Sequence, residues 1–158
     1  MAAFEYRQAE ELRDAFARHA VRCLFLGKSG AILLGFSDTT QDVDLFPERS
    51  RENGERLVAS LRDLGFDVTD QQTAEIVRGK DFVQLKNGPF DVDLVFAPDG
   101  IETFEHAWTR RVEVGGFAVC GLDDIIASKQ AANRPKDRES LPRLVSFRDY
   151  WKSGGGRH

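Results

Sequence analysis

Four aspartates stand in pairs on two short apolar segments, and they are the residues of this sequence best suited to chemistry. Asp42 and Asp44 lie in DVDLF, and Asp91 and Asp93 lie in FDVDLVF. Side chains alternate between the faces of a β-strand, so the two acids of each pair share one face. Carboxylates this close repel one another unless a cation lies between them, and their oxygens suit Mg²⁺ or Mn²⁺. The pattern predicts a divalent-cation site; the alternative is a solvated strand edge that discourages aggregation.

A glycine turn precedes the first acid pair. The sequence GKSG at residues 27–30 follows an apolar strand at residues 22–26 and leads into a short apolar helix predicted over residues 29–34. Backbone N–H groups at such a turn, together with the Ser29 hydroxyl, can bind phosphate, and Lys28 adds positive charge. The glycine turn and the second acid pair together favour a site with two divalent ions that holds a nucleoside triphosphate.

The elements that must position these residues are predicted from the spacing of apolar side chains. Pro47 is expected to stop the strand that carries Asp44, while Asn87-Gly88 (as a type I′ turn) and Gly115-Gly116 are expected to turn two hairpins. Residues 73–77 fit a helix and a strand equally well. Strands are predicted over residues 22–26, 42–46, 66–68, 81–86 and 89–96, with a hairpin over 111–120. Helices are predicted over residues 5–20, 29–34, 50–64, 101–110, 122–132 and 139–151.

This order of elements predicts an α/β (α+β) fold, in which a mixed central sheet is flanked by helices and followed by C-terminal helices. The length of 158 residues suits one compact domain, predicted over residues 1–152. The glycine-rich residues 153–158 are predicted to be a disordered tail. Pro142 fits the last helix only within its first turn, because a proline in a helix interior removes a hydrogen bond and clashes with the preceding turn.

Composition indicates a soluble globular protein in the cytoplasm. The N-terminus is acidic and amphipathic, without the apolar region of a secretory signal, and no apolar run is long enough to cross a membrane. Cys23 and Cys120 each lie in an apolar run and are expected to be reduced core residues. Residues 121–158 carry 8 basic against 5 acidic side chains, although the whole chain has a net charge of −4. This basic segment could face phosphates, but a solvated helix surface would explain it as well.

The motifs and their order resemble the nucleotidyltransferase superfamily to which DNA polymerase beta belongs. Its signature is an apolar strand, a Gly-Gly or Gly-Ser turn, a short helix and a D-x-D strand, with a third Asp on a later strand. The matching residues are Gly27-Lys28-Ser29, Gly35, Thr40 and Asp42-Val43-Asp44-Leu45. Residues 127–144 are similar to the K-x-x-A-x-x-R-x-x-D segment of small bacterial nucleotidyltransferases, including abortive-infection toxin enzymes of toxin–antitoxin systems. The sequence departs from the pattern at Lys28, where the superfamily has Gly or Ser.

The resemblance implies a role for each acid. Asp42 and Asp44 would be metal ligands, with Asp44 bridging both ions. Asp93 would be the third catalytic carboxylate, which ligates the catalytic metal and accepts the proton of the nucleophile. Asp91 is the alternative for this third position, because it lies on the same face of its strand.

The resemblance also implies residues that bind the nucleotide. Gly27, Lys28, Ser29 and Thr40 are expected near the triphosphate. Lys129 would be a phosphate ligand that Asp137 orients. Two structural alternatives stay open: Lys129 could complement a helix dipole, and Arg134 with Asp137 could be an ion pair that fixes the bend between the last two helices.

The function that the resemblance implies is transfer of a nucleoside monophosphate from a triphosphate such as ATP to an acceptor hydroxyl, with Mg²⁺ or Mn²⁺ as cofactor and pyrophosphate as product. A tRNA, a small molecule such as an antibiotic, or a protein could be the acceptor, and the sequence does not choose among them. One alternative is a module of the same fold that binds a nucleotide or partner without turnover. A glycosyltransferase D-x-D site is disfavoured because the short chain leaves no half for a nucleotide sugar.

Overall fold

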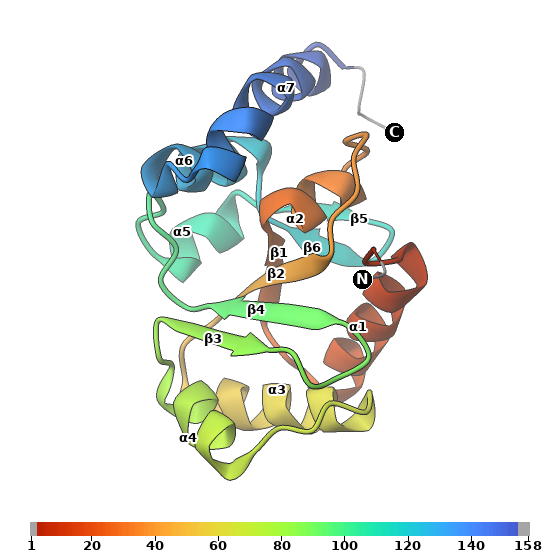
Figure 1. The fold of residues 1–158 in the computed structure, drawn as a ribbon, viewed down its shortest axis with the longest axis vertical. Coiled ribbons are helices and arrows are strands. Elements are labelled where there is room, and N and C mark those ends of the chain that lie inside the picture. The colour runs from red at the N-terminus through yellow and green to blue at the C-terminus, as the bar shows by residue number, and fades with distance from the viewer. Residues whose placement is uncertain (1–2, 155–158) are drawn as a thin grey trace.

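The computed structural model describes residues 3–154, and in them a six-stranded mixed sheet is surrounded by helices (Figure 1). The strand order is β3-β4-β2-β1-β6-β5, in which β2 with β4 and β1 with β6 are parallel pairs and the other neighbours are antiparallel. The predicted mixed sheet is confirmed. The strands are β1 Cys23–Leu26, β2 Asp42–Pro47, β3 Phe82–Leu85, β4 Asp91–Val95, β5 Val112–Val114 and β6 Phe117–Val119.

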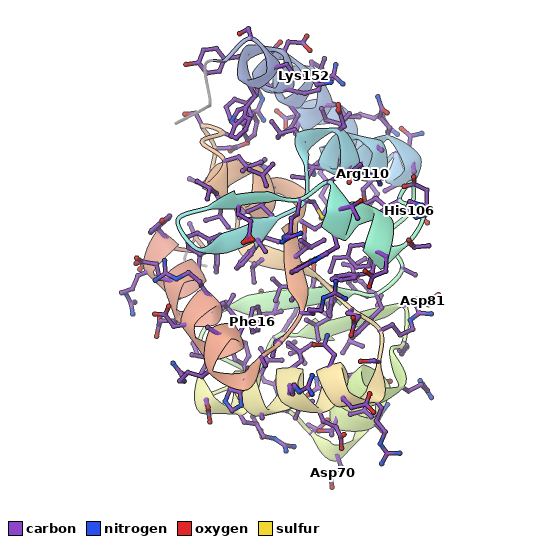
Figure 2. The ribbon with its side chains drawn as sticks, turned by 180° about the vertical axis from the view of Figure 1, so that it is seen from behind. Phe16, Asp70, Asp81, His106, Arg110 and Lys152 are labelled. Atoms are coloured by element: carbon purple, nitrogen blue, oxygen red, sulfur yellow. The ribbon has the colours of Figure 1, made fainter. Side chains whose placement is uncertain are left out.

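In Figure 1, α3 and α4 lie below the strands and α6 and α7 lie above them, whereas α1, α2 and α5 lie at the level of the strands. Figure 2 shows the reverse side, where Arg110 at the end of α5 reaches α6 and its Nε donates to Asp124 at 3.0 Å. No helix within residues 3–154 is long and apolar enough to span a membrane. The helices are α1 Tyr6–His19, α2 Gly27–Leu33, α3 Arg51–Asp63, α4 Asp70–Arg78, α5 Phe104–Thr109, α6 Leu122–Ala132 and α7 Pro135–Lys152.

The register between β2 and β4 places the two acid pairs side by side. Asp42 is opposite Asp91, and Asp44 is opposite Asp93, in a parallel ladder. The alternate residues of both strands, such as Val43, are fully buried on the other face. The core thus fixes which face carries the acids, because a slip of one residue would bury carboxylates in place of valines.

The glycine turn differs from the prediction. Helix α2 begins at Gly27, directly after β1, so residues 27–30 are the first turn of the helix and do not precede it. Gly27 has φ +62°, and a Cβ added there would lie 2.0 Å from Oδ2 of Asp44. Only glycine allows this approach, since any side chain would meet the carboxylate and strain the backbone. The turn therefore packs directly against the second acid of the D-x-D strand.

The hairpin of β3 and β4 is confirmed, but its turn is not type I′. Neither Asn87 nor Gly88 has a positive φ, which that turn requires at both positions. A Cβ at Gly88 would lie 2.1 Å from the ring of Phe66, so glycine is needed here to admit that ring. The predicted strand at residues 66–68 is also wrong, because this segment is a loop whose phenylalanine packs edge-to-face on Phe90 at 5.1 Å. In contrast, Gly115-Gly116 does turn a hairpin, with positive φ at both residues.

Three further boundaries were predicted differently or left open. Residues 73–77 belong to helix α4. Helix α7 begins at Pro135, earlier than predicted, and Pro142 lies in its interior rather than in its first turn. The helix can begin there because Pro135 suits the first helical position and Asp137 completes a capping box. Of the predicted tail, Ser153 and Gly154 form a turn and residues 155–158 lie outside the described residues.

Candidate active site

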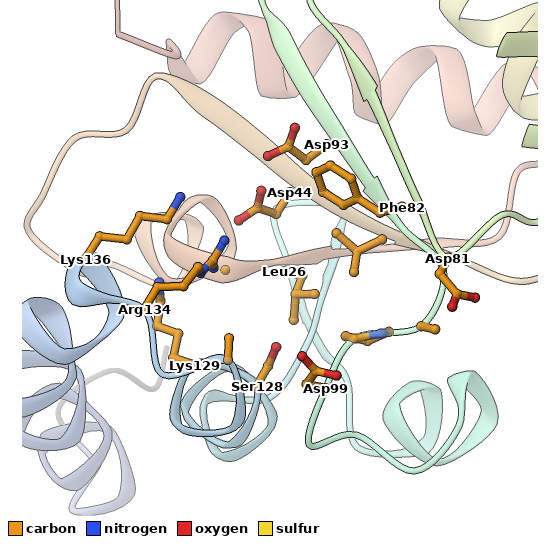
Figure 3. Close-up of a pocket in the computed structure, with 15 residues that line it drawn as sticks. Leu26, Asp44, Asp81, Phe82, Asp93, Asp99, Ser128, Lys129, Arg134 and Lys136 are labelled. Atoms are coloured by element: carbon orange, nitrogen blue, oxygen red, sulfur yellow. The ribbon is translucent and has the colours of Figure 1, made fainter. Parts of the chain in front are cut away.

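Two of the predicted acids, Asp44 and Asp93, lie next to each other on the wall of a cavity of about 440 Å³ (Figure 3). They are register partners on β2 and β4, so their side chains leave the same face of the sheet at the same level. Asp93 is only 8% exposed, and its Oδ1 accepts a hydrogen bond of 3.1 Å from the Gln84 amide on β3. The cavity is therefore lined by a pair of neighbouring carboxylates, of which Asp93 is buried and Asp44 half-buried.

Burial and mutual repulsion disfavour the charged forms of these acids. Burial, followed by the negative charge of Asp93, raises the pKa of Asp44 to about 7. Burial also raises the pKa of Asp93, and the charge of Asp42 adds to this, while the hydrogen bond from Gln84 acts in the opposite direction. Such a pair gains stability from any cation placed between its oxygens.

Asp42 and Asp91 are not in the lining of this cavity. Asp42 is half-buried at the start of β2, and its charge acts on both Asp44 and Asp93. Its register partner Asp91 lies at the same end of β4 and lines a different hollow near Phe90. The structure thus brings Asp93 rather than Asp91 next to Asp44.

The acids fit a divalent cation as a pair of ligands. Within residues 3–154, no group of three or more His, Cys, Asp or Glu side chains is arranged so that it could hold a metal ion. Mg²⁺ is commonly bound through one or two carboxylates, with water and substrate phosphates as its other ligands. The oxygens of Asp44 and Asp93 match that requirement, and the predicted cage of three acids, with Asp42 as a further ligand, is not preformed.

The opposite wall of the cavity is basic. Lys129 of α6, Arg134 between the helices, and Lys136 at the start of α7 all line it and extend toward the acids in Figure 3. The charge of Lys136 acts on Asp44 and Asp93, and so does that of Lys129 on Asp44. The basic C-terminal segment therefore faces the acids in part, whereas the sequence alone allowed it to be only a solvated surface.

Asp137 holds this basic wall together. Its carboxylate is fully buried and accepts hydrogen bonds from Nζ of Lys129 at 3.4 Å, and from Nε and the backbone N–H of Arg134 at 2.8 and 3.1 Å. Although burial acts in the opposite direction, these bonds lower the pKa of Asp137. Burial lowers the pKa of Lys129. The ion pair that the sequence offered as an alternative is present, and it also orients Lys129 toward the cavity.

The predicted turn residues have partners inside the protein, and among them only Gly27 lines the cavity. The Ser29 hydroxyl is buried, donates to the Leu26 carbonyl at 2.9 Å and accepts from the Asp44 N–H at 3.0 Å. Nζ of Lys28 lies 3.3 Å from Asp38, and the Thr40 hydroxyl donates to the Asp42 carbonyl at 3.1 Å. These contacts join the turn and the loop before β2 to the D-x-D strand.

Several cavity residues were not predicted from the sequence. Lys136 lies within the C-terminal segment that resembles the superfamily, one residue before Asp137. Its place in that segment could have indicated that it lies near the site. Phe82, Asp99 and Ser128 line the cavity from three different elements, and no spacing in the sequence relates them. Conversely, Cys23 and Cys120 are free and buried, and burial raises the pKa of both thiols, as expected for core residues.

The comparisons with known proteins agree with this geometry at the level of the fold. No family model and no curated protein matches the sequence. Among solved structures, the lincosamide antibiotic adenylyltransferase LnuA with bound lincomycin aligns with a TM-score of 0.65 at 13% identity, over 92% of this chain and 99% of that one. ANT(2")-Ia in complex with adenylyl-2"-tobramycin aligns with a TM-score of 0.61 at 17% identity, over 89% and 87%. A proposed nucleotidyltransferase from Thermotoga maritima aligns with a TM-score of 0.54 at 15% identity, over 90% and 92%.

These alignments cover nearly the whole chain, and the three aligned structures are described as nucleotidyltransferases or adenylyltransferases or as a complex with an adenylylated compound. The chain has the nucleotidyltransferase fold, and the resemblance to that superfamily is confirmed for the fold. The cavity between β2, β4 and α6–α7 is its candidate active site.

Proposed function

We propose that the protein is a metal-dependent nucleotidyltransferase, which moves a nucleoside monophosphate from a triphosphate to an acceptor hydroxyl. The observation that carries this proposal is that the cavity has two walls of opposite charge: the carboxylates of Asp44 and Asp93 face Lys129, Arg134 and Lys136. A triphosphate with a divalent cation matches both walls, because the cation neutralises the acids and the basic side chains neutralise the phosphates.

In the proposed reaction the acceptor oxygen forms a bond to the α-phosphorus of the triphosphate. The bond from that phosphorus to the oxygen bridging the α- and β-phosphates breaks, and pyrophosphate leaves with the electron pair. The acceptor proton passes to the Asp93 carboxylate and then to water. Lys129, held by Asp137, and Lys136 bind the negative charge of the leaving pyrophosphate. Catalysis would come from positioning and charge neutralisation rather than from a covalent enzyme intermediate.

Asp44 and Asp93 would hold Mg²⁺ or Mn²⁺, and Asp42 could approach as a further ligand when the cation reduces the repulsion among the three. The bound ion supplies polarisation of the α-phosphate and a template for the triphosphate. Gly27 would let the phosphates come close to the backbone at the start of α2, since no side chain stands there.

The solved neighbours support a small-molecule acceptor over a tRNA or a protein. One is described with lincomycin bound, and another with an adenylylated tobramycin. Both structures align with this chain over most of their length.

The proposal can be tested by incubating the protein with each α-labelled nucleoside triphosphate, Mg²⁺ or Mn²⁺, and pools of small hydroxyl compounds, tRNA or protein. Asp44→Asn and Asp93→Asn are each expected to reduce transfer by about 10³-fold, because they remove ligands and charge at the reacting phosphate. Asp91→Asn is the matched control: its acid lies outside the cavity, and transfer should stay within about threefold of wild type. Equal labelling by wild type and Asp44→Asn with every acceptor would contradict the proposal.

A second candidate is a module of the same fold that binds a nucleotide or a partner without turnover. It is favoured by the absence of a preformed three-acid cage in residues 3–154. The two candidates differ in one result: the module would bind a triphosphate with Mg²⁺ yet release no pyrophosphate with any acceptor pool.

A further inference from the structure

The third wall of the cavity, away from the basic helices, combines an exposed aromatic ring with acidic side chains. Phe82 of β3 is 48% exposed, one of three large hydrophobic side chains so exposed in residues 3–154, and it lines the cavity with Val95 and Pro98. Asp81 and Asp99 lie at the edges of this wall (Figure 3). We call these five residues, Asp81, Phe82, Val95, Pro98 and Asp99, the acceptor wall.

The acceptor wall adjoins the acid that would receive the acceptor proton. Phe82 is the register partner of Val95, and Val95 lies two residues after Asp93 on the same face of β4. Neighbours in this diagonal position on a sheet are within reach of an aromatic side chain. A group seated on Phe82 and Val95 would thus be next to the Asp93 carboxylate, while the basic residues lie on the other side of the acids (Figure 3).

The acceptor wall carries two carboxylates, whereas the cations that line the cavity lie on another wall. The cavity-lining cations, Lys129, Arg134 and Lys136, all come from the α6–α7 segment. Within the described residues Asp99 has no ion pair, while Asp81 lies 3.1 Å from Arg49. A tRNA acceptor needs basic side chains along its phosphate backbone, and this wall offers carboxylates in that place.

We propose that the acceptor is a small hydroxyl compound with an apolar ring and a protonated amine, bound on Phe82 and Val95 with its amine toward Asp99. This inference rests on the proposed function and specifies its substrate class. Phe82 supplies an apolar face for the ring, and Asp99 supplies the counter-charge for the amine. The cavity of about 440 Å³ is in the range of small-molecule pockets. Seating on this wall brings the hydroxyl to Asp93.

Four matched glycosides test the inference by binding. Phenyl β-D-glucosaminide has both the ring and the amine, its N-acetyl form lacks the charge, methyl β-D-glucosaminide lacks the ring, and methyl N-acetyl-glucosaminide lacks both. Dissociation constants are measured by calorimetry or ligand-observed NMR at pH 7. The protein is first saturated with Mg²⁺ and the tightest-binding non-hydrolysable triphosphate. The phenyl amine is expected to bind about tenfold more tightly than either compound that lacks one feature.

Variants separate the two contacts. Phe82→Ala should lose the preference for the phenyl ring and keep that for the amine, whereas Asp99→Asn should do the reverse. Tyr150→Ala and Asp149→Asn are matched controls on the exposed surface of α7 and should keep both preferences. Triphosphate affinity should stay within about twofold in all four variants, which shows that the fold and the nucleotide site are intact.

The outcomes separate this inference from the proposed function. If no triphosphate binds with Mg²⁺, the proposed function fails. If a triphosphate binds but the four glycosides bind equally, or none binds up to millimolar concentration, the acceptor inference is overturned and the proposed function is untouched. Tighter binding of tRNA or of a protein substrate than of the phenyl amine would also overturn it.

Discussion

Asp44 lines the cavity, whereas Asp137 is buried behind the basic wall that faces it, and the surroundings of the two carboxylates shift their pKa values in opposite directions. Asp137 is fully buried, yet Lys129 and Arg134 lower its pKa and keep it ionised. Asp44 faces another acid, and burial together with the charge of Asp93 raises its pKa to about 7. The first charge is compensated within the chain, which is typical of a structural ion pair. The second is compensated only in part, by the charges of Lys129 and Lys136 across the cavity, which is typical of a site that awaits a cation.

Of the variants that test this contrast between Asp44 and Asp137, removal of the Asp137 carboxylate is expected to have the largest effect on stability. An amide in Asp137→Asn cannot compensate two cations, so Lys129 would be left buried and charged, and we expect a loss of about 3 kcal/mol in the free energy of unfolding. Urea denaturation measures this loss. Asp149→Asn removes an exposed ion pair with Arg148 and should cause no measurable change. Equal stability of the two variants would show that the Asp137 cluster is not structural.

Because Gly27 lies so close to Asp44, a side chain at position 27 is expected to reduce stability less than Asp137→Asn does, and to reduce transfer activity as well. Gly27→Ala should cost about 2 kcal/mol, because the new Cβ meets the Asp44 carboxylate and the φ of +62° is unfavourable. Transfer activity should fall by about 100-fold, since the carboxylate must move. Gly65→Ala has φ +96° but its nearest contact is at 3.8 Å, so it should lose stability without losing activity. A parallel loss of activity in both variants would contradict the role of Gly27.

Replacing Asp44 by a neutral residue removes its repulsion with Asp93, so we expect the free energy of unfolding to rise by an amount that depends on pH. Its folded pKa of about 7 lies above the unfolded value of 3.8, so the folded state binds more protons between these values and stability falls as pH rises through this range. Without divalent ions, the free energy of unfolding of Asp44→Asn at pH 8 should therefore be about 1–2 kcal/mol higher than that of wild type. This value is smaller than the full pKa shift would give, because solvent at the cavity mouth screens the charge. The two should agree at about pH 4.

Thermal unfolding in EDTA at the two pH values measures this difference, which corresponds to a shift of roughly 2–8 °C at pH 8. A variant less stable than wild type at pH 8 would mean that the Asp44 charge is already compensated in the fold. The contrast with Asp137 would then disappear.

Substitution of Lys136 is expected to have the smallest effect, which should be confined to triphosphate binding. It is exposed at the cavity mouth, so Lys136→Ala should leave stability unchanged and raise the KM for the triphosphate by about tenfold, with a smaller change in kcat. Lys152→Ala, at the far end of α7, is the control and should leave KM unchanged. An unchanged KM in Lys136→Ala would remove that residue from the proposed phosphate contacts.

Local periodicity accounts for much of what the sequence predicted. The alternation of acids and valines placed Asp44 and Asp93 on one face of two strands, and the structure adds only that the strands are neighbours in register. The helix predicted from residue 50 does begin there, because Ser50 is its N-cap and the Ser50 hydroxyl accepts a hydrogen bond from the Asn53 N–H. These features depend on residues close in sequence, where spacing carries the information.

The errors lie where distant residues decide the local structure. Gly88 was taken as a turn glycine, but the ring of Phe66 requires it. Pro142 was expected to mark a helix start, whereas Pro135 and the capping box of Asp137 begin α7 earlier and outweigh the cost of an interior proline. The acceptor wall could not be predicted either, because Phe82, Val95 and Asp99 meet only in three dimensions.

The central claim is that Asp44 and Asp93 together bind a divalent cation with a triphosphate, and Mn²⁺ binding measured by electron paramagnetic resonance tests it most directly. With a non-hydrolysable triphosphate present, wild type is expected to hold Mn²⁺ about 100-fold more tightly than Asp93→Asn or Asp44→Asn. Asp91→Asn should bind as wild type does. Equal Mn²⁺ affinity in wild type and Asp93→Asn would contradict the account.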